Sequence, residues 1–135
     1  MKKIFTILMA LTMILSAFAV SASASTPEPT VSPRWTNTSL VTPQITFSDG
    51  VGYAEFSATA KYTPKTFVVD TYVYVQSGSD WIYVTEHHVT KTGMTVGSSC
   101  SFDQVTGAYY KADFYLTVSG GGVVEELSFT SYGPN

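Results

Sequence analysis

Short alternating runs of β-branched and aromatic residues fill most of the chain, and they constrain its fold more than any other feature of the sequence. From Gln44 onward, clusters of Gly, Asp and Ser separate these runs roughly every 8 to 12 residues, which is the spacing of short antiparallel strands. No stretch of this part keeps a helical period. The runs are Gln44–Ser48, Tyr53–Tyr62, Phe67–Gln76, Trp81–Val89, Met94–Phe102, Tyr110–Val118 and Val123–Thr130. They predict an all-β, seven-stranded antiparallel sandwich of immunoglobulin-like or fibronectin-III-like type.

Alternation within each run predicts which residues face the core, because successive side chains of a strand point to opposite faces. In the second run the predicted core positions are Ala54, Phe56, Ala58, Ala60 and Tyr62. In the fifth run they are Met94, Val96, Ser98, Cys100 and Phe102. Cys100 is the single cysteine of the chain, so it forms no intramolecular disulfide. At a core position we expect it to act as a small hydrophobic residue with a raised thiol pKa.

The outer faces of the two predicted sheets differ in composition. A standard sandwich of this type places strands three, four, six and seven in one sheet and strands one, two and five in the other. The smaller sheet has small, polar outer positions, namely Gln44, Thr46, Ser48, Glu55, Ser57, Thr59, Lys61, Thr95, Ser99 and Ser101. The larger sheet has predicted core positions at Phe67, Val69, Val73, Val75, Ile82, Val84, Phe114 and Leu116.

Five aromatic residues then share the outer face of the larger sheet: Tyr72, Tyr74, Trp81, Tyr83 and Tyr115. The polar residues predicted around them are Asp70, His87, Lys111 and Asp113. Each ring buries roughly 150–250 Å², so such a face reaches the size of interaction patches on monomeric proteins. Aromatic rings beside carboxylates suit either a glycan or a protein partner. Cross-strand packing and β-propensity explain the same pattern without any ligand.

Nucleophilic catalysis is not expected, because the candidate groups lie on opposite faces. The outward face of the fourth run holds Trp81, Tyr83, Thr85 and His87. Cys100 faces the core, so it does not meet His87. A glycoside hydrolase needs two carboxylates that face each other across a cleft. Alternation instead places the adjacent carboxylates of Glu125 and Glu126 on opposite sides of their strand. We therefore expect no catalytic residues and no enzyme activity.

Metal binding is not expected either. His87 and His88 are adjacent in one run and point to opposite sides, so they do not chelate together. Glu86 shares a face with His88, but two ligands make only a weak zinc site. Calcium bound through Asp49 or Asp103 in loops remains an alternative. The prediction is that the domain has neither a metal nor another cofactor.

The chain begins like an exported protein. Lys2 and Lys3 precede an apolar stretch, and Ala22-Ser23-Ala24 forms a small-residue cleavage site. We expect a signal-peptide helix at 1–24, a flexible lead and entry segment at 25–43, of which Ser25 to Ser32 is the Pro-rich flexible part, and the sandwich domain at 44–135. The apolar stretch is too short to span a bilayer, and no later run is longer, so the cleaved protein is expected to be secreted without a membrane span.

The predicted mature chain is acidic. Without the two lysines of the signal peptide it keeps five basic residues against ten acidic ones, a net charge of −5. This charge disfavours a nucleic-acid partner, since phosphate recognition requires basic side chains. It also disfavours electrostatic docking to anionic lipid.

Three short motifs resemble a group of small secreted immunoglobulin-like proteins of Gram-positive gut bacteria, whose function is unassigned. They are Pro33-Arg34-Trp35-Thr36-Asn37, Ser77-Gly78-Ser79-Asp80-Trp81 and Gly107-Ala108-Tyr109-Tyr110. The last motif is similar to the tyrosine corner of immunoglobulin domains, in which a Tyr hydroxyl bonds back to an upstream loop. Either Tyr109 or, by its inward position, Tyr110 is the corner residue. The resemblance implies the fold and no activity.

These observations favour a secreted, non-catalytic binding module that contacts an extracellular glycan or protein through its aromatic sheet face. Two alternatives remain. One is a small secreted toxin or bacteriocin-like protein, and the other is a self-associating structural or matrix component. The sequence does not choose among ligands.

Overall fold

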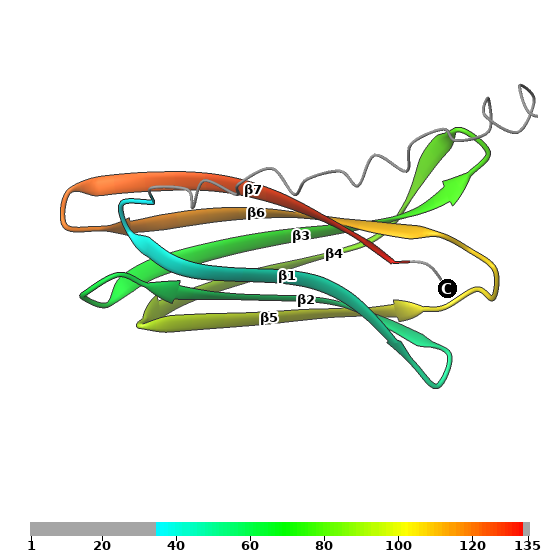
Figure 1. The fold of residues 1–135 in the computed structure, drawn as a ribbon, viewed down its shortest axis with the longest axis horizontal. Coiled ribbons are helices and arrows are strands. Elements are labelled where there is room, and N and C mark those ends of the chain that lie inside the picture. The colour runs from blue at the N-terminus through cyan, green and yellow to red at the C-terminus, as the bar shows by residue number, and fades with distance from the viewer. Residues whose placement is uncertain (1–34, 134–135) are drawn as a thin grey trace, which may run out of the picture. The chain divides into compact units, whose positions relative to one another are not determined.

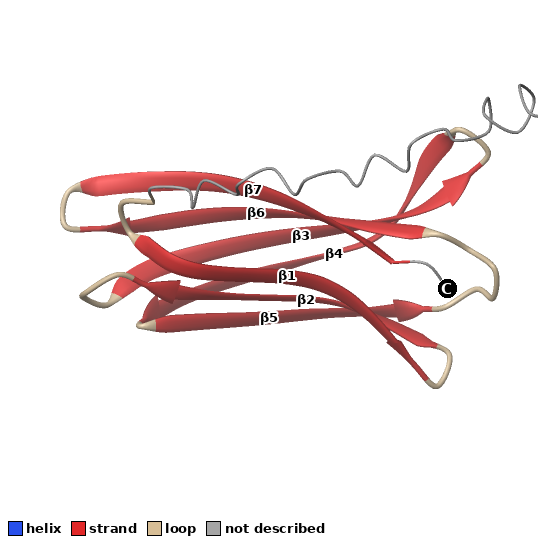
Figure 2. Cartoon of the chain, in the orientation of Figure 1, coloured by secondary structure: helices blue, strands red, loops and turns tan. Residues whose placement is uncertain are grey.

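The computed structural model describes residues 35–133, and every regular element within this range is a β-strand (Figure 2). The strands are β1 (Thr38–Ser48), β2 (Val51–Ala60), β3 (Lys65–Ser77), β4 (Asp80–Gly93), β5 (Thr95–Asp103), β6 (Tyr110–Gly120) and β7 (Val123–Gly133). Each of the seven predicted runs is confirmed as a strand. The predicted signal peptide at 1–24 and the lead as far as residue 34 lie outside the described residues.

The strands form two antiparallel sheets. One has the order β1-β2-β5 and the other the order β4-β3-β6-β7. This is the division of strands that the sequence predicts. Figure 1 shows the strands of both sheets lying roughly along one axis, with the end of the β3–β4 hairpin projecting away from the other strands.

The core lies between the two sheets and is built from alternate residues of the strands. Its buried hydrophobic members are Ala54, Phe56, Ala58, Ala60, Phe67, Val69, Val73, Val96, Cys100, Phe102, Tyr110, Ala112, Phe114, Leu116 and Val118. The small alanines of β2 leave space for large side chains opposite them. Phe56 of β2 stacks on Phe114 of β6 with ring centroids 5.3 Å apart, which joins the sheets at the centre of the core.

Two residues predicted to face the core are exposed instead, because each lies beyond the end of its strand. Tyr62 lies two residues after Ala60, the last residue of β2, adopts a positive φ of 67° and is 87% exposed. Met94 precedes the first residue of β5 and is 43% exposed. Alternation has no meaning outside a regular strand, so the predicted orientation fails at both positions.

A β-bulge in β4 changes which of its residues face outward. Val73 pairs with Thr85, but the next residue of β3, Tyr74, pairs with Tyr83, so Val84 is an extra residue on β4. A bulge reverses the alternation on one side of it. Val84 packs partly buried against the core.

The bulge overturns the predicted outward position of His87. His87 pairs with the fully buried Thr71 and therefore lies on the inner side of the sheet, as Thr85 does. His88 takes the outward position opposite Asp70. His87 is nevertheless exposed, because β4 is an edge strand.

Ile82 is a second correction on β4. It was predicted in the core, but it is 51% exposed. Its partner Val75 is the last residue of β3 that pairs with β6. Ile82 therefore lies at the point where the β3–β4 hairpin extends beyond its pairing with β6.

The first strand begins at Thr38 rather than at Gln44, so the end of the predicted lead and entry segment at 25–43 belongs to the sheet. Glu125 of β7 anchors this start. Its carboxylate accepts hydrogen bonds from Thr36 N at 2.5 Å, Asn37 N at 3.2 Å and Thr38 Oγ1 at 2.7 Å. The adjacent Glu126 is exposed, so the predicted separation of the two carboxylates is confirmed.

Asn37 is held in the same anchor. Its Nδ2 donates to the carbonyl oxygens of Val118 at 3.3 Å and Val123 at 3.1 Å, and the residue is 3% exposed. Asn37-Thr38-Ser39 matches a glycosylation acceptor sequence, but the amide nitrogen is buried and already engaged in hydrogen bonds.

Tyr110, rather than Tyr109, forms the predicted corner. It is buried at the start of β6, and its hydroxyl oxygen accepts a 2.8 Å hydrogen bond from the backbone N–H of Val105. This bond ties the loop before β6 to the core.

Candidate functional site

The outer face of the four-stranded sheet is arranged in rows that cross all four strands. In the order β4, β3, β6 and β7, the first row is Tyr83, Tyr74, Lys111 and Tyr132. The second row is Glu86, Tyr72, Asp113 and Thr130, and the third is His88, Asp70, Tyr115 and Ser128. We call these three rows, together with Trp81 and Tyr109 beside the first, the aromatic face.

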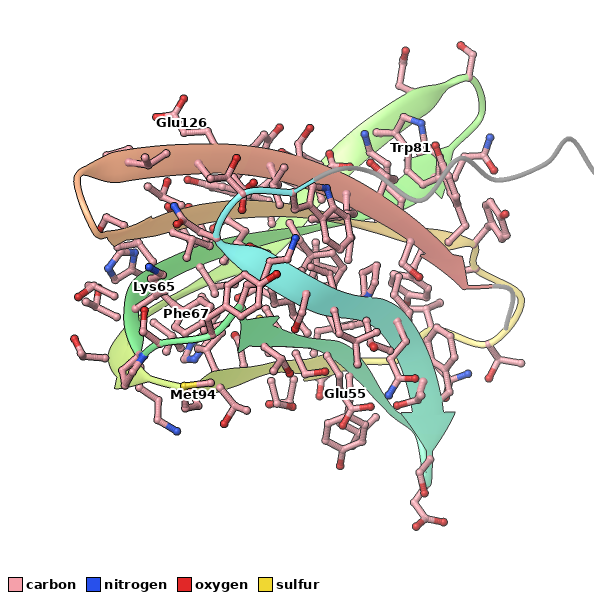
Figure 3. The ribbon with its side chains drawn as sticks, turned by 60° about the vertical axis from the view of Figure 1, so that its left-hand side comes forward. Glu55, Lys65, Phe67, Trp81, Met94 and Glu126 are labelled. Atoms are coloured by element: carbon pink, nitrogen blue, oxygen red, sulfur yellow. The ribbon has the colours of Figure 1, made fainter. Side chains whose placement is uncertain are left out.

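All five aromatic residues predicted for this surface lie on the aromatic face. Tyr72 and Tyr115 pack edge to face with centroids 5.9 Å apart, and Tyr74 and Tyr83 do so at 6.3 Å. Trp81 lies at the projecting hairpin (Figure 3). It is joined to Tyr74 through the ammonium of Lys111, which lies 5.3 Å from the Trp81 ring centroid and 4.8 Å from that of Tyr74.

The sequence reasoning missed two further rings, Tyr109 and Tyr132. Together with Trp81 they form a cluster in which every pair of ring centroids is 6.1 Å apart. The rings of Tyr109 and Tyr132 are nearly parallel, with an interplanar angle of 10°. Tyr132 lies beyond the predicted end of the last run and Tyr109 just before the sixth, so longer runs with the same alternation find both.

The ammonium group of Lys111 is held by contacts with residues of the first and second rows. Its Nζ lies 3.1 Å from Asp113 Oδ2, and the side chains of both residues are largely covered. Thr130 Oγ1 donates to the other oxygen of Asp113 at 2.7 Å. An ammonium over two ring faces and beside a carboxylate is a cation–π arrangement completed by an ion pair.

The third row contains a second polar group. His88 Nδ1 lies 2.5 Å from Asp70 Oδ1, and His88 Nε2 lies 3.1 Å from Thr90 Oγ1. With the proton on Nδ1, the neutral imidazole donates to Asp70 and accepts from the Thr90 hydroxyl.

An open hollow of about 350 Å³ lies between these groups and is lined by Asp70, Tyr72, Tyr74 and Tyr115. Partial burial raises the pKa of Tyr72, and the negative charges of Asp70 and Glu86 add to this shift. Burial, and then the charge of Glu86, raise the pKa of Tyr83 as well. Both shifts favour the neutral phenol, which can donate a hydrogen bond from its hydroxyl.

Cys100 and His87 both lie on the inner sides of their sheets, so the predicted separation of these two residues onto opposite faces is wrong. Cys100 is 5% exposed, and burial raises the pKa of its thiol, although a hydrogen bond with Thr85 opposes the shift. His87 is exposed on the edge strand. Among residues 35–133 no group of three or more His, Cys, Asp or Glu side chains is placed to hold a metal ion. Within the same range no helix is long and apolar enough to cross a membrane.

Comparisons with known proteins add two structural likenesses. No family model matches the chain, and no curated protein matches it. The solution structure of R. palustris CsgH is similar with a TM-score of 0.43 and 16% identity, over 70% of this chain and 92% of CsgH. The E. coli curli protein CsgC is similar with a TM-score of 0.39 and 13% identity, over 67% of this chain and 94% of CsgC. At these scores neither likeness carries an argument about function.

Proposed function

We propose that this protein is a secreted, non-catalytic binding module that holds an extracellular ligand on its aromatic face. We assign it to the immunoglobulin-like or fibronectin-III-like sandwiches. The strand division and the Tyr110 corner support this fold type. The signal-peptide pattern at 1–24 supports export.

The observation that carries the proposed function is the joining of the rings across all four strands. Two edge-to-face pairs, the Trp81 cluster and Lys111 form a continuous amphipathic surface. Several of its rings remain accessible, with Tyr83, Tyr115 and Tyr132 each at least half exposed. Exposed aromatic surface of this extent marks interaction sites, and Tyr and Trp dominate binding hot spots.

Charge argues against self-association through this face. The three rows contain the carboxylates of Asp70, Glu86 and Asp113 and one lysine, Lys111. Two copies of a face with this excess of negative charge repel each other. The partner is therefore a different molecule.

Retention on immobilised extracellular material tests the proposed function. Wild type, Trp81→Ala and Tyr74→Ala are passed over bacterial cell-wall polysaccharides, host glycans and host surface proteins. The matched control is Tyr53→Ala, which removes a tyrosine from the outer face of the other sheet. We expect at least one matrix to retain wild type and the control about tenfold better than the two aromatic-face variants. Equal retention of all four proteins, or none on any matrix, contradicts the proposal.

A further inference from the structure

The hollow on the aromatic face is lined by aromatic rings and a carboxylate, as the surroundings of the Lys111 ammonium are, but its lining contains no cationic side chain. At Lys111 an ammonium lies over the rings of Tyr74 and Trp81 and beside Asp113. In the hollow, the rings of Tyr72 and Tyr115 stand next to Asp70, and Tyr74 forms a further wall. The aromatic face thus already binds one primary ammonium group by this chemistry.

The charges around the hollow favour a cation. Glu86 pairs with Tyr72 from the β4 side and is exposed. Asp70 also borders Tyr72, and one of its oxygens, Oδ1, is in contact with His88 Nδ1. Lys111 is the only lysine in the three rows, and Asp113 already holds it. Neither Asp70 nor Glu86 thus has a lysine in these rows to balance it.

The raised pKa of Tyr72 agrees with this electrostatic environment. Burial is its first cause, and the charges of Asp70 and Glu86 contribute next. Burial disfavours any charge, so only the contribution of the Asp70 and Glu86 carboxylates to this shift also favours a positive charge.

The geometry points to a binding site for a primary ammonium group in the hollow of Asp70, Tyr72, Tyr74 and Tyr115, supplied by a lysine side chain of a partner polypeptide. The inference rests on the proposed function, because it names a ligand group for the same aromatic face. The lysine Nζ lies over the Tyr72 and Tyr115 rings and donates to Asp70, as Lys111 donates to Asp113. A basic polypeptide is the source because the acidic chain attracts it over longer range.

A titration with two short peptides tests this site. The probe is acetyl-Gly-Gly-Lys-Gly-Gly-amide, and the reference peptide has norleucine in place of lysine, which removes the charge and keeps the alkyl chain. Binding to the purified protein is followed by NMR shifts of the tyrosine rings. We expect saturable binding of the lysine peptide, about tenfold tighter than that of the norleucine peptide and weaker at high salt.

Two variants locate the site, and a third serves as the control. Asp70→Asn removes the charge and keeps the shape, and Tyr115→Ala removes a half-exposed ring without opening the core. We expect each to weaken binding of the lysine peptide about five- to tenfold, whereas Tyr53→Ala leaves it unchanged. Circular dichroism and thermal unfolding confirm that all three variants are folded.

The inference is overturned if the lysine peptide does not bind, if the norleucine peptide binds equally well, or if Asp70→Asn and Tyr115→Ala bind like wild type. These outcomes are distinct from failure of the proposed function. If retention on a matrix depends on Trp81 while the lysine peptide does not bind, the aromatic face is a binding surface for another chemistry. If neither is observed, both proposals are wrong.

Discussion

The two outer faces of the domain obey the same alternation but carry different side chains. On β1, β2 and β5 the outward positions hold mainly Ser, Thr, Gln and Glu, and Tyr53 is their single aromatic ring. On the four-stranded sheet the outward side carries seven rings, namely Tyr72, Tyr74, Trp81, Tyr83, Tyr109, Tyr115 and Tyr132. Figure 3 shows Glu55 and Trp81 on opposite sides of the domain.

This difference bears on why the rings are present. High β-propensity and cross-strand packing stabilise strands wherever aromatic residues occur, so on their own they enrich both faces. The three-stranded sheet is instead stable with small polar residues outside. A ligand that binds the aromatic face, as we propose, would favour aromatic residues on that face alone.

The prediction with the largest expected effect tests whether the two sheets, and with them both outer faces, share one core. Phe114 is fully buried on β6 and stacks on Phe56 of β2. Phe114→Ala is expected to lower the free energy of unfolding by about 3–5 kcal/mol, because it removes buried surface and leaves a cavity. Urea unfolding measures the loss, with Tyr53→Ala as the outer-face control. A loss below about 1 kcal/mol contradicts this account of the core.

Trp81→Ala tests how far the aromatic face is also structural. The indole contacts Tyr109, Tyr132 and the Lys111 ammonium, so its removal is expected to cost about 1–2 kcal/mol of unfolding free energy. Trp81→Phe keeps a ring in the cluster and should recover most of this loss. Tyr53→Ala on the other face should cost only a few tenths of a kcal/mol. If the Trp81 and Tyr53 variants are equally stable, the ring cluster contributes no stability and only binding separates the two faces.

The inner sides of the sheets provide a third comparison, because each has one buried hydroxyl oxygen without a hydrogen-bond partner within the described range. These are Thr71 Oγ1 in the four-stranded sheet and Ser98 Oγ in the three-stranded sheet. Thr71→Val keeps the shape and removes the unsatisfied hydroxyl, so we expect a gain of about 1 kcal/mol in unfolding free energy. Ser98→Ala should gain less, since it also removes volume. Thermal unfolding of both variants checks the order, and a destabilised Thr71→Val protein contradicts it.

The fold and the choice of face could be predicted because both depend on local alternation and on the usual order of strands in a sandwich. Cys100 and Phe114 lie in the core as predicted, and all five predicted rings lie on the aromatic face. Tyr109 and Tyr132 were missed because they lie just outside the predicted ends of their runs. Composition does not define where a strand ends.

Other features depend on contacts that a single strand does not encode. The bulge at Val84 reverses His87 and His88, yet Val84 lies in an apolar and aromatic stretch with no glycine to mark it. The Glu125 anchor joins residues 87 to 89 positions apart in the sequence. The Asp70–His88 contact exists only because the bulge turns His88 outward, so this contact could not be derived from the sequence, although the residues that line the hollow were predicted on this face.

The smallest expected effect compares one carboxylate on each face. Asp113 is mostly covered, pairs with Lys111 and accepts from Thr130. Glu55 accepts from Gln44 Nε2 at 2.9 Å and Thr46 Oγ1 at 3.2 Å, but both bonds are exposed to water. We expect Asp113→Asn to cost about 1 kcal/mol of unfolding free energy and Glu55→Gln only a few tenths.

Salt sharpens this last comparison. A covered ion pair is screened less than an exposed hydrogen-bonded carboxylate, so the cost of Asp113→Asn should persist at high ionic strength. Urea unfolding of both variants at low and high salt measures the two costs. If Glu55→Gln costs as much as Asp113→Asn in both conditions, the carboxylates of the two faces are equivalent. The electrostatic difference between the faces then has to reside in Asp70 and Glu86, the residues beside the hollow.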